Sequence, residues 1–203
     1  MLTSDQNRKI NEIVEEFKEA ADFYRMEYSE DLMGMFRDFG CMLLLKCKVD
    51  TEGKADLERL LEGRHKLKGT VKRQLMTVSE ELAQLWEPGE QDGSGDTGEY
   101  EGSQNVWEMF QTALEEIFHF CLYSKGGKNR YLLPEETAKP LLRLLTFPEG
   151  MMAGNEGLVV LDTQCGAGSA LMAASRYLKN LRLMGYEKDE EMWAAAVIMS
   201  QLS

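Results

Sequence analysis

The chain contains 203 residues, of which 43% are hydrophobic and 29% are charged. This length is sufficient for one ordinary domain or for a domain with a helical arm, and it excludes a mini-protein. The net charge of −12 argues against sequence-independent binding to phosphate backbones, because that affinity comes from lysine and arginine displacing counterions.

The cysteine and histidine content predicts neither disulfides nor a metal centre. No C-x-x-C pair occurs among the four cysteines, and the two histidines, His65 and His119, belong to no metal-binding motif. The N-terminus lacks the basic and apolar regions of a signal peptide, and apolar runs such as Cys41 to Leu45 are too short to cross a bilayer. These observations predict a soluble, cytoplasmic protein without a metal site.

Residues 1–87 carry apolar side chains at helical spacing and predict a helical bundle arm. A capping box formed by Thr3 and Gln6 introduces the first helix. The first pattern is Ile10, Ile13, Phe17, Ala20, Tyr24 and Tyr28. The second is Leu32, Met35, Phe36, Phe39, Leu43 and Cys47, and a short third is Leu57, Leu60 and Leu61. The fourth is Leu67, Val71, Leu75, Val78, Leu82 and Leu85.

The fourth pattern of the arm is close to a heptad repeat. It fits either a coiled-coil partner or packing against neighbouring helices of the same chain, and the small number of repeats favours internal packing. A basic cluster lies around the start of this helix, where charges between leucines favour a solvated helix face over a phosphate site. The cluster comprises Arg64, His65, Lys66, Lys68, Lys72 and Arg73.

Residues 88–104 predict an acidic, glycine-rich linker or mobile loop. Six acidic residues from Glu87 to Glu101 have no basic residue between them and account for half of the net charge, and five glycines interrupt the segment. Such a composition buries too little apolar surface to offset the entropy of ordering. A solvated spacer is favoured over an acidic docking motif.

Residues 105–203 change character and predict the N-terminal part of an α/β domain. A helix is expected from Val106 to Ile117, and Pro134 is well placed to open another because its fixed φ suits the first turn. The run from Leu158 to Leu161 shows no polar alternation and predicts a buried parallel strand. The expected fold class is therefore α/β, with a mainly helical N-terminal arm.

The residues that follow this strand give the clearest indication of a ligand-binding site. Asp162 follows the strand, a turn with Gly166 and Gly168 comes next, and residues from Ala170 to Leu178 predict a helix. Glycines let the backbone approach a ligand closely, and N–H groups at a helix start hold anionic groups such as a carboxylate. We therefore expect a small-molecule site at this junction.

A second strand, Leu181 to Tyr186, places Glu187 at its carboxyl end. Ligands of open α/β sheets bind at that edge, where an acid accepts both hydroxyls of a ribose. A dinucleotide site would show G-x-G-x-x-G, but the turn lacks the third glycine. Asp162 before the glycines suits a ligand with a cationic group, which favours a sulfonium cofactor over a nicotinamide.

Three sequence elements resemble those of one known family. The stretch from Leu161 to Leu171, L-D-T-Q-C-G-A-G-S-A-L, resembles the D-P-x-C-G-S-G-x-x-L motif of adenine-specific DNA methyltransferases, particularly the modification subunit of type I restriction-modification systems. Asn129 to Ala138 resembles the G-x-Y-F-T-P-x-x-V-A element of that family, and Gly185 to Glu187 resembles its G-x-E element. The elements stand in the family's order, and the helical arm resembles the family's N-terminal helical domain.

The resemblance implies a Rossmann-like methyltransferase domain, with a sheet that is incomplete in these residues, and S-adenosylmethionine as the cofactor. Glu187 would bind the ribose of the cofactor. The residues around its methionine end would be Asp162, Cys165, Gly166, Ala167 and Gly168. The residues that cover it would be Tyr131, Leu132, Leu133 and Pro134.

One element of the family is absent from the chain. The family transfers methyl to the exocyclic amine of adenine with an N-P-P-F or D-P-P-Y motif that binds the flipped base, and no Pro-Pro pair occurs here. The expectation is a fragment, natural or engineered, that is inactive alone and has no catalytic residues of its own. DNA is then a partner only in the full-length enzyme or in a complex, with a separate specificity subunit as a further partner.

The sequence leaves two alternatives open. The chain could be a non-catalytic interaction module whose helical arm, from Leu67 to Leu82, binds a partner. Leu133 and Ala167, which replace a threonine and a serine of the family motifs, are compatible with that role. The chain could also be part of a methyltransferase that acts on RNA or on a small molecule, because fold and cofactor do not fix the substrate.

Overall fold

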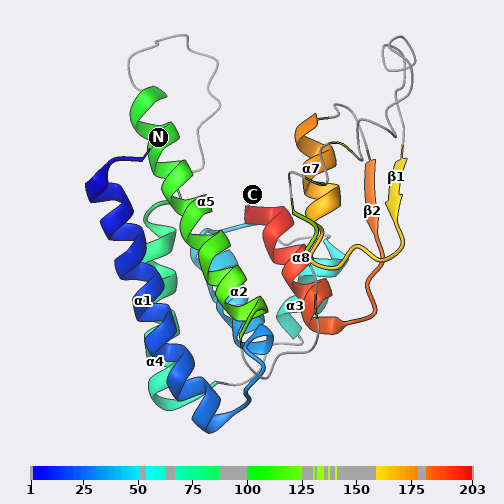
Figure 1. Cartoon of the computed structure of the whole chain (residues 1–203). Helices are drawn as coiled ribbons and strands as arrows, with labels where there is room; N and C mark the ends of the chain where they lie inside the picture. The colour runs from blue at the N-terminus through cyan, green and yellow to red at the C-terminus, as the bar shows by residue number, and fades with distance from the viewer. Residues whose placement is uncertain are drawn as a thin grey trace. The chain divides into compact units, whose positions relative to one another are not determined.

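The computed structural model describes residues 2–50, 54–62, 67–86, 100–124, 130, 132–134, 137, 140, 159–177 and 182–202. The chain divides into two compact units, Met1–Lys128 and Asn129–Ser203. Within the described residues the architecture is mainly helical, with seven α-helices and a parallel sheet of two strands near the C-terminus (Figure 1). The prediction of a mainly helical N-terminal part followed by parallel strands is confirmed at this level. None of the described helices is long and apolar enough to cross a membrane.

The first unit, here called the helical unit, is built from helices that pack on one another. The long helix α1 contacts α4 and α5, and α2 contacts the same two helices. In the described residues the elements of this unit are α1 (Ser4–Glu27), α2 (Met33–Lys46), α3 (Ala55–Glu62), α4 (Gly69–Ala83) and α5 (Tyr100–Leu122).

Helix α1 begins with the predicted capping box. The Thr3 N–H donates to Gln6 Oε1 at 2.7 Å, and the Gln6 N–H donates to Thr3 Oγ1 at 3.3 Å. Two backbone N–H groups that a helix start leaves without intrahelical acceptors are thus satisfied. The capping box is confirmed.

The core of the helical unit consists of the apolar patterns that the sequence predicted. All patterned residues of α1 except Tyr28 are buried, and so is the whole fourth pattern from Leu67 to Leu85. The rings of Phe17 and Phe39 meet edge to face with centroids 5.0 Å apart, a favourable aromatic geometry. Internal packing of the heptad-like pattern is confirmed, and its residues offer no free surface.

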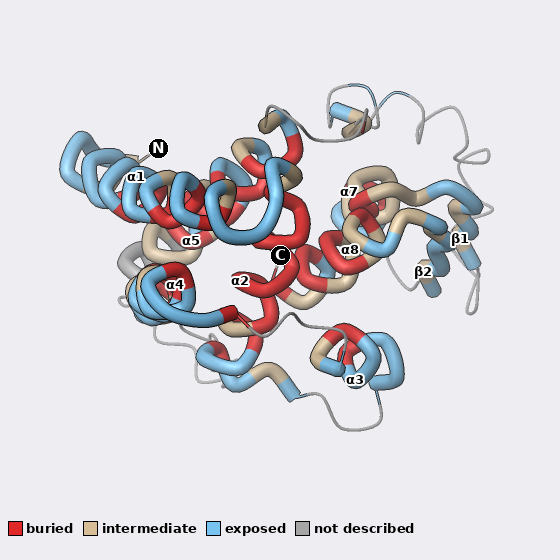
Figure 2. The backbone as a smooth tube through the Cα atoms, turned by 90° about the horizontal axis from the view of Figure 1, so that it is seen from below, coloured by how far each residue is buried: buried red, intermediate tan, exposed pale blue. Residues whose placement is uncertain are grey.

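Helix α2 is buried more completely than its pattern predicted. Figure 2 shows most of this helix as buried, and the buried residues include Arg37 and Asp38. Because α2 packs against both α4 and α5, little of its circumference is left for solvent. A helix that is buried on several sides has no polar stripe from which spacing alone could identify its orientation.

Helix α5 begins earlier than predicted. It starts at Tyr100, so residues 100–104 are helical although the sequence predicted a linker over 88–104, and residues 87–99 lie outside the described residues. Extending an existing helix costs little free energy, because each added residue gains a hydrogen bond and no new helix has to be nucleated. Helix α5 contacts α1 and α2 and belongs to the first unit. The boundary between the two units lies between Lys128 and Asn129, whereas the sequence predicted a domain start at residue 105.

The second unit, here called the α/β unit, contains a parallel β–α–β element followed by a helix. Its described elements are β1 (Val159–Asp162), α7 (Ser169–Tyr177), β2 (Arg182–Gly185) and α8 (Glu190–Leu202). Val159 pairs with Arg182 and Asp162 pairs with Gly185, and α7 packs against both strands. A helix between the strands is the usual connection for a parallel pair. Of the helix predicted after Pro134, Thr137 and Pro140 are helical, and most of the remainder lies outside the described residues.

The strand that was predicted to be buried forms, but it is not buried. Val159 and Leu161 are 49% and 53% exposed, whereas Val160 is half-buried. Alternate residues of a strand face opposite sides of the sheet. The side of Val160 is covered by α7, against which its register partner Leu183 packs. The expectation of two covered faces is therefore wrong for this two-stranded sheet.

Candidate functional site

The glycine turn, residues 163–168 between β1 and α7, is held by local hydrogen bonds. Asp162 Oδ1 accepts from the Gln164 N–H at 3.0 Å, which fixes the first half of the turn. The Gly168 N–H donates to the Cys165 carbonyl at 2.8 Å. Gly166 and Gly168 have φ values of 55° and 81°, which glycine adopts without the steric cost that a side chain would add.

The backbone contact between β1 and β2 continues beyond the sheet. The Tyr186 N–H donates to the Asp162 carbonyl at 2.9 Å, and the Cys165 N–H donates to the Tyr186 carbonyl at 3.0 Å. The glycine turn and the segment after β2 are therefore joined at the carboxyl end of both strands. This is the edge at which open α/β sheets bind ligands.

Gly185 allows the glycine turn to approach β2 closely. A Cβ atom at this position would lie 2.7 Å from Cys165 Sγ and 2.9 Å from Leu171 Cδ1. Any side chain would therefore displace the turn or the start of α7. In the sequence Gly185 is recognisable only as part of the G-x-E element, and its packing role is visible only in three dimensions.

Glu187 lies directly after β2 and contacts the glycine turn. Its Oε2 accepts from the Gly166 N–H at 3.0 Å, and its Oε1 accepts from the Asp189 N–H at 2.8 Å. The side chain is half-buried. Because a carboxylate oxygen has two lone pairs, each oxygen keeps capacity for one further donor beside these bonds.

The remaining turn residues present backbone rather than side chains. Ala167 is 1% exposed and Gly168 is buried, so neither offers a side-chain contact to a ligand. The first N–H groups of α7, which begins at Ser169, have no intrahelical acceptor. Ligand contacts at this end of the turn would therefore come from backbone N–H groups.

The predicted covering segment is described in part. Tyr131 lies outside the described residues, Leu132 and Leu133 are half-buried, and Pro134 is exposed. Leu133 packs against the buried residues Ala173 and Ala174 of α7. This contact attaches the segment to the helix that follows the glycine turn.

The carboxylates near the turn give it a negative potential. Burial raises the pKa of the Cys165 thiol, the charges of Asp162 and Glu187 raise it further, and a backbone hydrogen bond lowers it. The thiol therefore stays protonated at neutral pH and is not an activated nucleophile. The same two carboxylates would attract a cationic group of a bound ligand.

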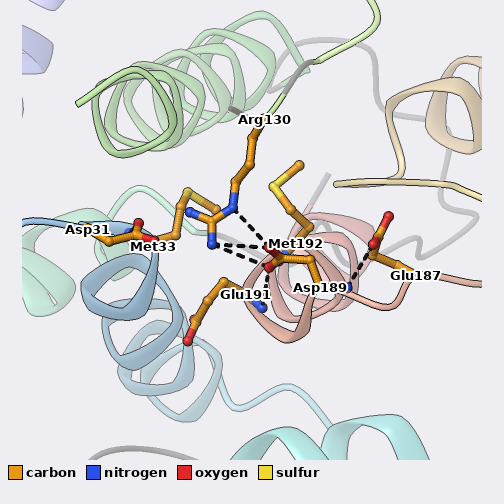
Figure 3. A network of polar contacts seen from close by, with 7 residues as sticks. All are labelled: Asp31, Met33, Arg130, Glu187, Asp189, Glu191 and Met192. Atoms are coloured by element: carbon orange, nitrogen blue, oxygen red, sulfur yellow. Dashed lines mark hydrogen bonds and ion pairs between the residues drawn. The ribbon is translucent and has the colours of Figure 1, made fainter. Parts of the chain in front are cut away.

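Two charged residues that the sequence analysis did not single out form an ion pair in this unit. Arg130 Nη2 lies 3.3 Å from Asp189 Oδ1 (Figure 3). Asp189 could have been noticed as an acidic residue at the start of a helix. Arg130 carried no comparable signal, because its partner is 59 residues away in the sequence.

The structure thus brings the predicted residues from Asp162 to Gly168 into one turn and places Glu187 in contact with that turn. Within the described part of the chain, no group of three or more His, Cys, Asp or Glu residues is arranged to hold a metal ion. Comparisons of the chain with protein-family models, with curated proteins and with solved structures gave no match. The described fold and site define a helical unit followed by a parallel β–α–β element with polar residues at the carboxyl edge of its strands.

Proposed function

We propose that the α/β unit is the S-adenosylmethionine-binding portion of a Rossmann-like methyltransferase. The observation that carries the proposal is the hydrogen bond between Glu187 Oε2 and the Gly166 N–H at 3.0 Å. It joins the acid after β2 to the glycine turn after β1, so that both can contact one ligand at the carboxyl edge of the sheet.

The acceptor capacity of Glu187 supports recognition of a ribose. Each carboxylate oxygen accepts one backbone N–H, from Gly166 and from Asp189. One further acceptor position on each oxygen matches the two neighbouring hydroxyls of a ribose. The backbone bonds also orient the carboxylate before a ligand arrives, which lowers the entropy lost on binding.

The charge around the turn supports a cofactor with a cationic centre. Asp162 and Glu187 make the surroundings of Cys165 negative, and after burial their charges are the next causes that raise the pKa of that thiol. A sulfonium or an ammonium group would be stabilised there, while a carboxylate could accept hydrogen bonds from the first N–H groups of α7. The methionine part of S-adenosylmethionine carries all three groups.

Adenine in DNA is the substrate that we propose for the complete enzyme, with a type I modification subunit as the closest functional class. Its support is the order of the three motifs from Asn129 to Glu187. Because the N-P-P-F or D-P-P-Y motif is absent from these residues, the chain would bind the cofactor without transferring methyl. DNA and a specificity subunit would then be partners of the complete assembly.

Isothermal titration calorimetry tests this proposal directly. S-adenosylmethionine and S-adenosylhomocysteine are each titrated into the wild-type chain, into Glu187→Gln and into Glu187→Ala. Both substitutions should weaken binding at least tenfold, because hydrogen bonds to a charged acceptor are lost. Glu190→Gln, which alters an exposed acid at the start of α8, should bind like the wild type.

Two results would overturn the proposal. One is the absence of binding heat for both ligands at millimolar concentration. The other is an affinity of Glu187→Gln and Glu187→Ala equal to that of the wild type. Methyl transfer to DNA by the chain alone would contradict the argument from the missing motif.

A further inference from the structure

Arg130 is a buried cation at the beginning of the covering segment. Its side chain is only 4% exposed, and its guanidinium faces the carboxylate of Asp189, which is 21% exposed. Nη2 lies 3.3 Å from both Asp189 oxygens, and Nε lies 3.4 Å from Oδ2. A guanidinium that contacts both oxygens fixes the orientation of the carboxylate as well as its position.

Asp189 connects this ion pair to the start of α8. Its Oδ1 accepts from the N–H groups of Glu191 at 3.0 Å and Met192 at 3.2 Å (Figure 3). These bonds make Asp189 the N-cap of α8 and satisfy two donors at the helix start. The carboxylate is therefore held from one side by the helix and from the other by Arg130.

The backbone of Asp189 continues the network to Glu187, the residue that we propose binds the ribose. The Asp189 N–H donates to Glu187 Oε1 at 2.8 Å, and Glu187 Oε2 accepts from the Gly166 N–H at 3.0 Å. A continuous series of contacts thus runs from Arg130 through Asp189 and Glu187 to the glycine turn. It joins the segment that precedes Leu132–Pro134 to the residue that would bind the ribose.

We propose that Arg130 is a positioning residue for ribose recognition, acting on Glu187 through Asp189. The inference rests on the proposed function, because it concerns the ligand of the same site. Arg130 does not need to touch the ligand. It fixes the turn at residues 187–189, so that both Glu187 oxygens present their remaining acceptor positions to a pair of hydroxyls.

Arg130 can act on Glu187 because its ion-pair partner Asp189 and Glu187 lie in the same short turn. Without the guanidinium, the half-buried Asp189 carboxylate would lose the charge of Arg130 and would be held less firmly, through its bonds to the N–H groups of α8. The N–H that holds Glu187 Oε1 belongs to the same residue, so the Glu187 carboxylate would lose its fixed orientation. Lysine at position 130 would keep the charge but not the fixed fork that reaches both oxygens.

The test compares two ligands that differ only in the ribose hydroxyls. Adenosine and 2′,3′-dideoxyadenosine are titrated calorimetrically into the wild-type chain, Arg130→Ala, Arg130→Lys and the control Arg8→Ala. Arg8 is a suitable control because its side chain is 71% exposed on α1 of the other unit. Circular dichroism verifies that each variant is folded.

The wild type should prefer adenosine by about tenfold or more, since only adenosine has the two hydroxyls that donate hydrogen bonds to the carboxylate. Arg130→Ala should reduce this preference to nearly one, by weakening adenosine binding while leaving dideoxyadenosine binding almost unchanged. Arg130→Lys should retain part of the preference, and Arg8→Ala should retain all of it. A merely structural role of Arg130 would instead weaken both ligands equally and leave their ratio intact.

The outcomes separate this inference from the proposed function. If the wild type prefers adenosine and Arg130→Ala keeps that preference, the positioning role is wrong while the ribose site stands. If the wild type binds neither ligand or does not distinguish them, the positioning role and the ribose role of Glu187 are both wrong, whereas cofactor binding is decided by the S-adenosylmethionine titration. If Arg130→Ala does not fold, Asp189→Asn decides, because asparagine keeps a capping oxygen but weakens the ion pair. Its preference for adenosine should fall, and an unchanged preference would overturn the inference.

Discussion

In the helical unit, Phe17, Phe36 and Phe39 are completely buried, whereas in the α/β unit Val159, Leu161 and Tyr186 are 49%, 53% and 59% exposed. The helical unit thus places most of its large apolar residues in an internal core, although Met26 and Tyr123 are among those that stay exposed. The α/β unit has a covered sheet side at Val160 and Leu183 and an exposed apolar side.

The α/β unit differs from the helical unit also in its polar contacts, which gather at the candidate site. At the carboxyl edge of β1 and β2, the half-buried residues Asp162, Glu187 and Asp189 accept hydrogen bonds from backbone N–H groups. The two units are therefore suited to different tasks. We infer that the helical unit contributes most of the stability, while the proposed ligand contacts lie in the α/β unit.

The largest expected effect comes from one chemical change made once in each unit. Leu75→Ala empties a fully buried position in α4 and should reduce the free energy of unfolding by about 2–5 kcal/mol. Leu161→Ala removes a side chain that is 53% exposed on β1 and should cost less than about 1 kcal/mol. Urea denaturation monitored by circular dichroism measures both values. Equal costs would remove the distinction between the two units.

Gly185→Ala should be the most damaging small substitution in the α/β unit. The added Cβ would lie 2.7 Å from Cys165 Sγ, and the displacement should cost about 1–3 kcal/mol in thermal or chemical unfolding. Cys165→Ala removes this sulfur, so the same glycine substitution should cost clearly less in that background. An unchanged cost in the double variant would show that the contact with Cys165 is not the cause.

Alkaline pH should destabilise the helical unit through a buried thiol. Burial raises the pKa of Cys47 from 9.0 to about 12, so the folded chain keeps this proton where the unfolded chain loses it. The stability that Cys47 contributes is therefore complete below pH 9 and falls by about 1.4 kcal/mol per pH unit between pH 9 and 12.

Cys47→Ala provides the comparison for this pH dependence. The free energy of unfolding of the wild type minus that of the variant should be constant below pH 9 and should decline above it. Urea titrations from pH 7 to the highest pH at which the chain is still folded measure this difference. A difference that does not change with pH would contradict the assignment to Cys47.

The smallest expected effect concerns the capping box of α1. Thr3→Ala removes the hydroxyl that accepts the Gln6 N–H and should cost about 1 kcal/mol. Thr3→Ser keeps the hydroxyl and should be close to the wild type. The midpoint of urea unfolding distinguishes the two variants, and equal destabilisation by both would show that the cap does not contribute.

The sequence predicted the helical unit well because its signals are local. The spacing of Ile10, Ile13 and Phe17 identified the buried side of α1, and Thr3 with Gln6 identified its start. Burial of Arg37 and Asp38 was not predictable, because it depends on which other helices surround α2. The start of α5 at Tyr100 was missed because its first residues have the composition of a linker.

The candidate site was predictable as a set of segments but not as a network. Gly166, Gly168 and Glu187 were recognisable from strand, turn and acid in the expected order. The steric role of Gly185 and the pairing of Arg130 with Asp189 depend on contacts between distant parts of the sequence. Exposure of Leu161 was also hidden, because an apolar run does not show whether one side of its sheet is covered.

A titration of the ¹⁵N-labelled chain with S-adenosylhomocysteine, followed by two-dimensional NMR, shows whether the glycine turn and the residues after β2 form the cofactor site. The account predicts that the amide signals of Gly166, Gly168 and Asp189 shift on binding, because these groups line or support the proposed site. Signals of the buried residues of α1 and α4, such as Phe17 and Leu75, should not move. Unshifted signals of Gly166 and Asp189 at millimolar ligand, or the main shifts in α1 and α4, would contradict the account.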